Sequence, residues 1–121
     1  MYNIESFRNY CLKKAHVTES FPFDEDTLVF KVANKMFALS SLESPELSVN
    51  LKCDPERALE LRENYPDAVF PGYHMSKIHW NTVLPNQGIT PELWKEMIDE
   101  SYNLIVKSLP KKTQRELGFL E

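Results

Sequence analysis

The stretch that decides the fold is TLVFKVANKMFALSS, which runs from Thr27 to Ser41. Its first half has the period of two that is typical of a β-strand, with Leu28, Phe30 and Val32 at alternate positions. Apolar residues resume after Asn34 and Lys35. Because Asn tolerates the left-handed backbone of a tight turn, the pattern predicts a β-hairpin over residues 27–41.

Two more strands are expected after this hairpin. Residues 47–53 alternate apolar side chains with Ser48, Asn50 and Lys52, so these three polar residues are predicted on the opposite face. A short strand is expected near residues 78–84, after a loop that opens with Pro71 and Gly72.

The remaining segments have helical patterns. Residues 3–15 carry an apolar stripe, formed by Ile4, Phe7, Cys11 and Ala15. Asp54-Pro55-Glu56 and Thr90-Pro91-Glu92 predict helix starts, because Asp or Thr caps free amides, Pro fits the first turn and Glu complements the helix dipole. The second of these helices carries an inward stripe of Trp94, Met97, Ile98, Ser101, Ile105 and Leu109. Pro66 and Pro110 end the two helices, and residues 111–118 form a short basic helix or a frayed tail.

Strands that are grouped in the sequence, with helices set apart from them, are typical of an α+β fold. We predict a single domain over residues 1–121 with an antiparallel sheet whose helices cover one face. The apolar stripes predict that the helices over residues 3–15 and 90–109 pack on the same face of this sheet.

Composition narrows the class of protein. The 121 residues carry a net charge of −4, so any nucleic-acid surface has to be a local patch on an acidic body. Cys11 and Cys53 lack the spacing of a metal or redox motif, and their apolar neighbours predict small buried side chains in a reducing compartment. No signal peptide or membrane-spanning run is seen, which predicts a cytoplasmic protein without a membrane partner.

The stretch from Pro71 to Val83 holds two His, one Lys, one Trp and one Tyr. This mixture of donors, a cation and aromatic faces suits contact with a ligand or a nucleic acid. His74 and His79 are five residues apart, a spacing that fits neither a helical zinc pair nor one face of a strand, so no metal is predicted. A Trp in an alternating strand is more often a core residue than a stacking platform, so the pattern favours a buried Trp80 and leaves stacking as the alternative. No catalytic constellation and no cofactor motif is present, and we expect a protein that is not an enzyme.

Basic residues suggest a phosphate-binding surface. No acid separates Lys107, Lys111, Lys112 and Arg115, while Lys31 and Lys35 lie on the predicted hairpin and Lys77 in the 71–83 stretch. Lysines on edge strands also protect against edge pairing, and that interpretation stays open. If the hairpin and Lys77 converge, they could straddle phosphates, with Tyr73 or Trp80 available for stacking.

Several segments together resemble the MmcQ/YjbR family of small bacterial proteins. They are Phe21-Pro22-Phe23-Asp24, Lys31-Val32, Lys35-Met36-Phe37-Ala38-Leu39, Val49-Asn50-Leu51-Lys52-Cys53, Pro71-Gly72-Tyr73-His74-Met75, Lys77, His79-Trp80-Asn81-Thr82-Val83 and Ser101-Tyr102. The Gly-Tyr-His-Met block with the following Lys and His-Trp is the specific one. Asn34 stands where the family is expected to carry Gly, and Ser76 where Asn is commoner.

The resemblance implies a frataxin-like α/β architecture and DNA binding through paired β-hairpins. It does not carry iron binding across, because residues 3–15 contain a single acid, Glu5, where frataxin-like proteins use an acidic first helix.

Two functions are therefore expected, with an uncharacterised enzyme a distant third. The first is weak binding of duplex DNA, mainly at phosphates, by Lys31, Lys35, Lys77, His79, Lys111, Lys112 and Arg115. The alternative is a small-ligand or protein-interaction module centred on residues 74–80, with Tyr73, His74, Lys77 and Trp80 as its contacts.

Overall fold

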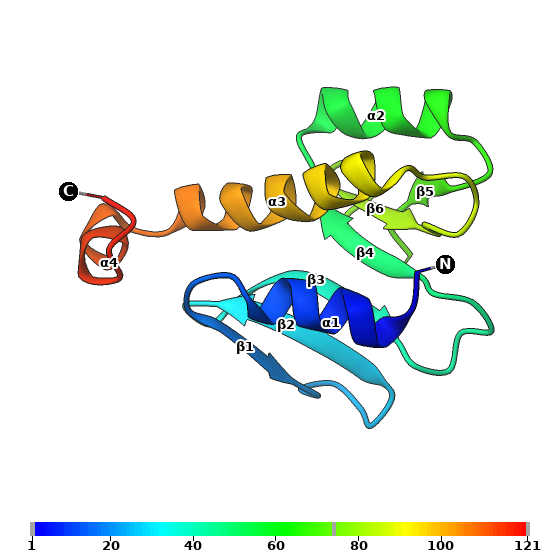
Figure 1. Ribbon diagram of the computed structural model, residues 1–121. Coiled ribbons are helices and arrows are strands. Elements are labelled where there is room, and N and C mark those ends of the chain that lie inside the picture. The colour runs from blue at the N-terminus through cyan, green and yellow to red at the C-terminus, as the bar shows by residue number, and fades with distance from the viewer. Residues whose placement is uncertain (1, 74, 121) are drawn as a thin grey trace.

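The computed structural model describes residues 2–73 and 75–120. The helices are α1 (Ile4–Leu12), α2 (Pro55–Asn64), α3 (Pro91–Ser108) and α4 (Lys111–Glu116). The strands are β1 (Val17–Ser20), β2 (Thr27–Val32), β3 (Lys35–Ser41), β4 (Val49–Lys52), β5 (Val69–Pro71) and β6 (Trp80–Val83). This order confirms the predicted α+β class, with helices that cover one face of an antiparallel sheet (Figure 1).

The sheet has the strand order β1-β2-β3-β4-β6-β5, and every neighbouring pair is antiparallel. β6 therefore lies between β4 and β5, so the chain adds β5 at the edge and returns inward. Sequence patterns did not predict β1 or β5. Both are short edge strands, and β5 ends at Pro71, whose missing N–H suits an edge position.

The predicted hairpin is β2–β3. Its turn residues Ala33 and Asn34 both have positive φ, at 49° and 68°, as the primed two-residue turns require. A bulge between Phe30 and Lys31 places both Phe37 and Ala38 toward the helices. After the bulge, Lys31 pairs with Met36.

The main core lies between the sheet and the helices. Leu28, Phe30 and Val32 are buried there against Phe7 of α1 and Ile98 of α3, which confirms the predicted face of the hairpin and the common face of the two helices. The apolar stripe predicted for α3 is fully buried. Helix α1 is shorter than predicted: it ends at Leu12, and Ala15 is exposed.

The predicted helix starts are confirmed at Asp54 and Thr90. The Asp54 side chain accepts a hydrogen bond from the amide of Glu56, and Thr90 accepts one from the amide of Leu93. Both helices begin with a proline. Residues 111–116 are helical rather than frayed, so α4 is an ordered C-terminal element.

Candidate functional site

The helix-free face of the sheet has its own small apolar cluster. Val29, Leu39 and Trp80 are buried in it, and Met36 and Met75 pack against them. Trp80 is only 8% exposed, so its ring forms part of this cluster and does not offer an open stacking face. Of the alternatives left open for Trp80, the buried position is the one that the structure shows.

The helix-free face also has a one-sided charge. Register places Lys31 beside Met36 and Lys52 beside Trp80, so both lysines lie on this face. The predicted placement of Ser48, Asn50 and Lys52 opposite the core side chains of β4 agrees with the alternation of burial in that strand. Among the strand residues described, the side chains of this face include these two cations and no carboxylate.

The loop between β5 and β6 is fastened to the start of β6. The amide of Gly72 donates to the carbonyl of Trp80 at 2.8 Å, and the amide of Trp80 donates to the carbonyl of Ser76 at 2.9 Å. A Cβ on Gly72 would lie 2.8 Å from the Trp80 Cβ and 2.9 Å from its carbonyl oxygen. The glycine of the motif is therefore required because the loop backbone lies directly on Trp80.

Lys77 and His79 belong to this loop and are both exposed. The Lys77 ammonium donates to the carbonyl of Gly72 at 3.1 Å, which uses one of its three donors inside the loop. The backbone carbonyl of His79 accepts from the amide of Cys53 at 2.7 Å. Tyr73 is 69% exposed. His74, also predicted as a ligand contact, lies outside the described residues.

Arg62 of α2 holds the same loop from the helix side, and the sequence analysis did not single it out. Its Nε donates to Asn81 Oδ1 at 2.7 Å, and its terminal nitrogen donates to the carbonyls of Lys77 and Trp80. A charged residue on a helix ordinarily indicates a solvated face, so Arg62 did not stand out. The one signal for this contact is its partner Asn81, a polar residue that is buried next to it in the fold.

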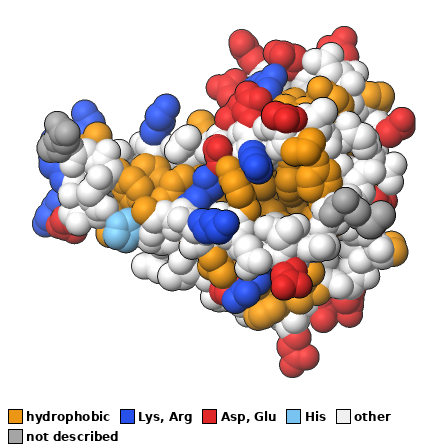
Figure 2. All heavy atoms as spheres, viewed as in Figure 1, with side chains coloured by type: hydrophobic (Ala, Val, Ile, Leu, Met, Phe, Trp, Pro, Cys, Tyr) orange, Lys and Arg blue, Asp and Glu red, His pale blue; other side chains and the backbone are white. Residues whose placement is uncertain are grey.

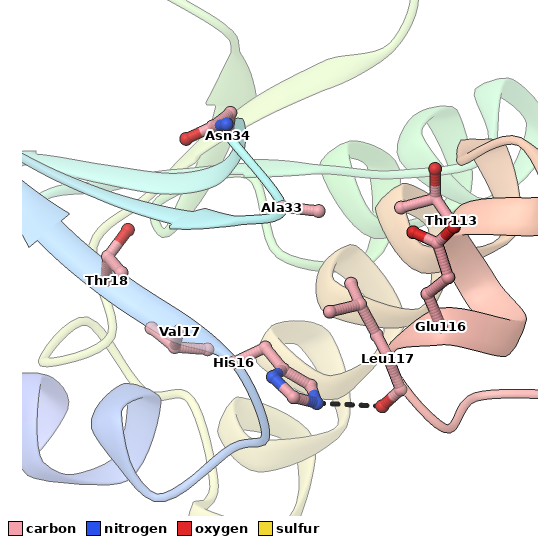
Figure 3. Close-up of a pocket in the computed structure, with 8 residues that line it drawn as sticks. All are labelled: His16, Val17, Thr18, Ala33, Asn34, Thr113, Glu116 and Leu117. Atoms are coloured by element: carbon pink, nitrogen blue, oxygen red, sulfur yellow. Dashed lines mark hydrogen bonds between the residues drawn. The ribbon is translucent and has the colours of Figure 1, made fainter.

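The tip of the β2–β3 hairpin and α4, which carry most of the predicted basic residues, lie side by side. The hairpin tip, Ala33 and Asn34, and residues Thr113 and Glu116 of α4 line one hollow of about 560 Å³ (Figure 3). His16 fixes α4 there, because its Nε2 lies 2.7 Å from the carbonyl oxygen of Leu117.

None of the described residues that line this hollow is Lys or Arg, and the cations are neighbours of the lining residues in the sequence. Lys35 at the start of β3 is exposed, and Lys31 is half-buried. The three basic residues of α4, Lys111, Lys112 and Arg115, are exposed, and Figure 2 shows Lys and Arg gathered at the α4 end. Lys77 and His79 are not part of this group, because β4 separates β6 from the hairpin.

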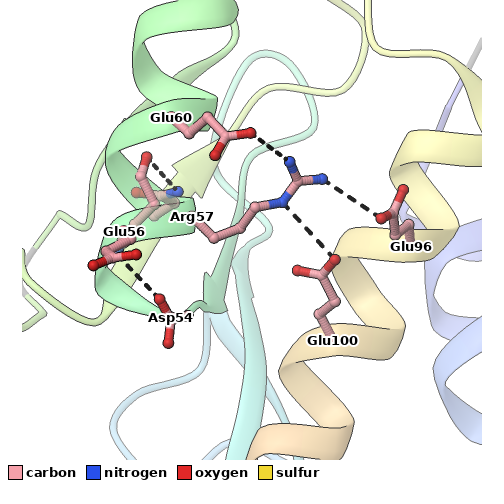
Figure 4. Close-up of polar contacts among 8 residues, drawn as sticks. Asp54, Glu56, Arg57, Glu60, Glu96 and Glu100 are labelled. Atoms are coloured by element: carbon pink, nitrogen blue, oxygen red, sulfur yellow. Dashed lines mark hydrogen bonds and ion pairs between the residues drawn. The ribbon is translucent and has the colours of Figure 1, made fainter.

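The acidic residues are concentrated elsewhere, above all between α2 and α3. Arg57 contacts Glu60 at 3.2 Å, Glu96 at 3.5 Å and Glu100 at 3.9 Å (Figure 4). Burial, reinforced by the Glu96 carboxylate, raises the pKa of Glu100 above its ordinary value, although Arg57 acts in the opposite direction. In Figure 1, α2 and α4 lie at opposite ends of the fold, so this acidic group is remote from the basic end.

Five of the segments that resemble the MmcQ/YjbR family contribute residues to a second hollow, of about 580 Å³, on the helix-free face. It is lined by Phe23, Asp24, Thr27, Met36, Leu39, Ser41, Ser48, Asn50, Tyr73, Met75 and Thr82. Of the predicted ligand contacts that the structure describes, Tyr73 lines it, whereas Lys77 and Trp80 do not. The other lining residues were not predicted as contacts, because their convergence depends on the pairing of β3, β4 and β6.

The described residues include neither a metal-binding cluster nor a helix that could span a membrane. In the ranges 2–73 and 75–120, no group of three or more His, Cys, Asp or Glu is placed to hold a metal ion. None of the helices described is both long and apolar enough to cross a membrane.

Comparison with known proteins agrees with the resemblance of the motifs. The sequence model of the family described as YjbR matches residues 12–104. The chain is 36% identical over 113 residues to the uncharacterised protein YbdF of Escherichia coli O157:H7, which covers 93% of this chain and 92% of that protein. It is 30% identical over 114 residues to the uncharacterised protein YjbR of Escherichia coli K12, and the aligned residues cover 94% of this chain and 96% of that protein.

Solved structures show the same fold. The Deinococcus radiodurans protein DR2400, of the DUF419 domain type, superposes with a TM-score of 0.92 and 40% identity, over 98% of this chain and 89% of that one. A protein from Pseudomonas syringae superposes with a TM-score of 0.71 and 27% identity, over 85% of this chain and 98% of the other. The family match over most of the chain, together with these relatives, shows that the chain belongs to the YjbR family.

Proposed function

We propose that the protein binds duplex DNA weakly and without sequence preference, through the basic end formed by the β2–β3 hairpin and α4. This surface, called the basic end below, consists of Lys31, Lys35, Lys111, Lys112 and Arg115. The observation that carries the proposal is the shared hollow in which the hairpin tip and α4 face each other. Because the hairpin tip and α4 are neighbours, we infer that their cations, which are 76 or more residues apart in the sequence, act as one surface.

Contacts at this surface suit phosphates better than base edges. Four of its five cations are lysines, which act as point charges and carry little base specificity. Helix α4 is six residues long and begins with Lys111 and Lys112, so it offers no row of base-reading side chains along a groove. Its one intrahelical ion pair, Lys112 with Glu116, is 4.0 Å long between exposed side chains and costs little to exchange for a phosphate.

The net charge of −4 does not prevent this interaction. Exposed charges separated by more than about 8 Å are largely screened at physiological salt, so the acids of α2 and α3 act weakly at the opposite end. Lys77 and His79, on the other side of β4, would add a second contact for a longer duplex. We expect that contact to be weaker, because the Lys77 ammonium is already bound to the carbonyl of Gly72.

The test compares substitutions of exposed lysines inside and outside the basic end. Binding of a fluorescent 20-base-pair duplex is followed by anisotropy at low salt for the wild type, for Lys111→Gln with Lys112→Gln, and for Lys95→Gln. Lys95 is exposed on α3 and does not belong to the basic end. The double variant should bind severalfold more weakly with a salt slope lowered by about two, and Lys95→Gln should bind as the wild type does. If each substituted lysine lowered the affinity by the same factor in both variants, net charge rather than this surface would govern binding.

A small-ligand module is the second candidate function, and one observation favours it. The hollow on the helix-free face brings together family-motif residues from five separate segments, among them Phe23, Met36, Asn50 and Tyr73. Its location differs from the expected centre at residues 74–80, of whose described residues only Met75 lines it.

A further inference from the structure

The hollow on the helix-free face is large enough for a small molecule. Its volume of about 580 Å³ lies within the range of ligand pockets, roughly 300–1,000 Å³. Met36 and Leu39 of β3 and Met75 of the β5–β6 loop are among the residues that line it, and all three belong to or pack against the small apolar cluster of this face. These side chains supply an apolar and polarisable surface that adapts to a flat ring.

Two aromatic side chains stand at the same hollow from different segments. Phe23, in the loop between β1 and β2, is 64% exposed, and Tyr73, in the loop after β5, is 69% exposed. Large aromatic side chains are usually buried, so two of them exposed around one cavity indicate a surface that a ring could cover. Phe21, in the same loop as Phe23, is also exposed but does not line the hollow.

The polar groups of the hollow have a defined orientation. The Thr82 hydroxyl accepts a hydrogen bond from the amide of Tyr73 at 3.0 Å and donates its own proton to Asn50 Oδ1. This arrangement turns the Asn50 Nδ2 group, with its two donors, away from Thr82. Within the described part of the chain, that Nδ2 group donates no hydrogen bond to protein.

The lining does not select a charged ligand. Among the described residues that line it, Asp24 and the phenol of Tyr73 are the ionisable side chains. The Asp24 carboxylate accepts from the amides of Asp26 and Thr27 at 2.8 Å and 2.7 Å and from the Thr27 hydroxyl at 3.2 Å, and the backbone bonds lower its pKa. Because this carboxylate is already engaged by its own loop and the described lining includes no Lys, Arg or His, a neutral ligand with hydrogen-bonding groups matches best.

We propose that this hollow binds a neutral nucleoside-like molecule, which is a planar heterocycle with a hydroxylated substituent. The ring lies on Met36 and Met75 between Phe23 and Tyr73, and an acceptor on its edge receives a hydrogen bond from Asn50 Nδ2. The hydroxyls of Ser41 and Ser48, at the other side of the hollow, face the hydroxylated part. This site shares no residue with the basic end, so the inference stands independently of DNA binding there.

Two sources could supply this chemistry: a free nucleoside, or an unpaired nucleotide within a single strand. The test uses adenosine, guanosine, cytidine and uridine, and a single-stranded hexanucleotide of mixed sequence, each titrated against the full chain and followed by ligand-observed NMR. For a nucleoside we expect a dissociation constant of about 10⁻⁴ M, as is usual for a ligand of this size. Tighter binding of the hexanucleotide, by tenfold or more, would identify the strand as the source, and equal or weaker binding the free nucleoside.

The chain offers a matched pair of variants for the same measurement. Phe23→Ala should weaken binding about tenfold, because it removes one stacking face, whereas Phe21→Ala should leave the affinity unchanged. Asn50→Asp keeps the acceptor for Thr82 but replaces the two donors by an acceptor, and it should also weaken binding at least tenfold. Melting temperatures within a few degrees of the wild type confirm that each variant is folded.

The proposal is overturned if neither the nucleosides nor the hexanucleotide binds below a dissociation constant of about 10⁻² M, a hundredfold weaker than expected. It is also overturned if Phe23→Ala and Phe21→Ala bind equally. Substitutions of Lys111 and Lys112 report only on the basic end, so failure of one proposal leaves the other measurable.

Discussion

Replacement of Gly72 by alanine tests how the loop after β5 is positioned. A Cβ at this residue would meet the Trp80 Cβ at 2.8 Å, its carbonyl oxygen at 2.9 Å and its carbonyl carbon at 3.1 Å. Two of these atoms belong to the backbone of β6, so no flexible side chain can move aside. The loop itself has to shift, and the hydrogen bond from Gly72 to Trp80 is then lengthened or lost.

The magnitude of this effect follows from three contributions. Overpacking of a close contact costs about 1–3 kcal/mol, and loss of one backbone hydrogen bond costs about 1 kcal/mol. The alanine restricts the unfolded chain, which offsets about 0.4–1 kcal/mol. We therefore expect Gly72→Ala to lower the free energy of unfolding by about 2–3 kcal/mol, and to displace Tyr73 and Met75 from the hollow that they line.

Urea unfolding followed by circular dichroism measures the change, with Gly88→Ala as the control. Gly88 has a φ of 90° and no atom within 4 Å of a built Cβ, so its cost is only the strained backbone, about 1 kcal/mol. The two variants separate a steric requirement from a conformational one. If Gly72→Ala proved as stable as the wild type, the reasoning that its contact with Trp80 fixes the loop would be refuted.

Three further predictions concern other parts of the fold. Ala33→Asn combined with Asn34→Gly should raise the free energy of unfolding by about 1 kcal/mol in urea titrations, because both positions have positive φ; an unchanged midpoint would argue against a strained turn. The raised pKa of Glu100 means that the folded protein holds its proton more tightly than the unfolded chain, so this group lowers stability as pH rises through its titration. Glu100→Gln should therefore increase the melting temperature at pH 7 and leave it unchanged at pH 3, and a gain of equal size at both pH values would contradict this cause. Burial raises the pKa of Cys11 to about 12 and that of Cys53 to about 11, so a thiol reagent at pH 8 should modify neither in the folded protein and both in urea; rapid reaction of the folded protein would show that these thiols are accessible.

Local signals account for most of the fold that the sequence predicts. The hairpin over residues 27–41 is specified by its own alternation and turn, and the helices that follow Asp54 and Thr90 by their caps and first-turn prolines. These features need no knowledge of distant residues. The edge strands β1 and β5 are different, because four and three residues carry little pattern, and their pairing is determined by β2 and β6.

The candidate sites were less predictable for the same reason. Alternation alone placed Asn50 and Lys52 opposite the core, but the hollow beside Asn50 requires β6 to lie next to β4 and both loops to reach the same face. Likewise, Lys111 and Lys35 belong to separate basic stretches of the sequence, and the packing of α4 beside the hairpin tip depends on the tertiary fold. Arg62 was missed because its three acceptors come from residues 77–81, across a loop.

The salt dependence of duplex binding tests the central proposal most directly. Five cations form the basic end, so the logarithm of the association constant should fall with the logarithm of salt concentration with a slope of about −4 to −5. The dissociation constant near physiological salt should be about 10⁻⁴–10⁻⁶ M for any sequence. A slope near zero, an absence of binding at low salt, or a thousandfold preference for one sequence would contradict the account of a phosphate-binding surface at the β2–β3 hairpin and α4.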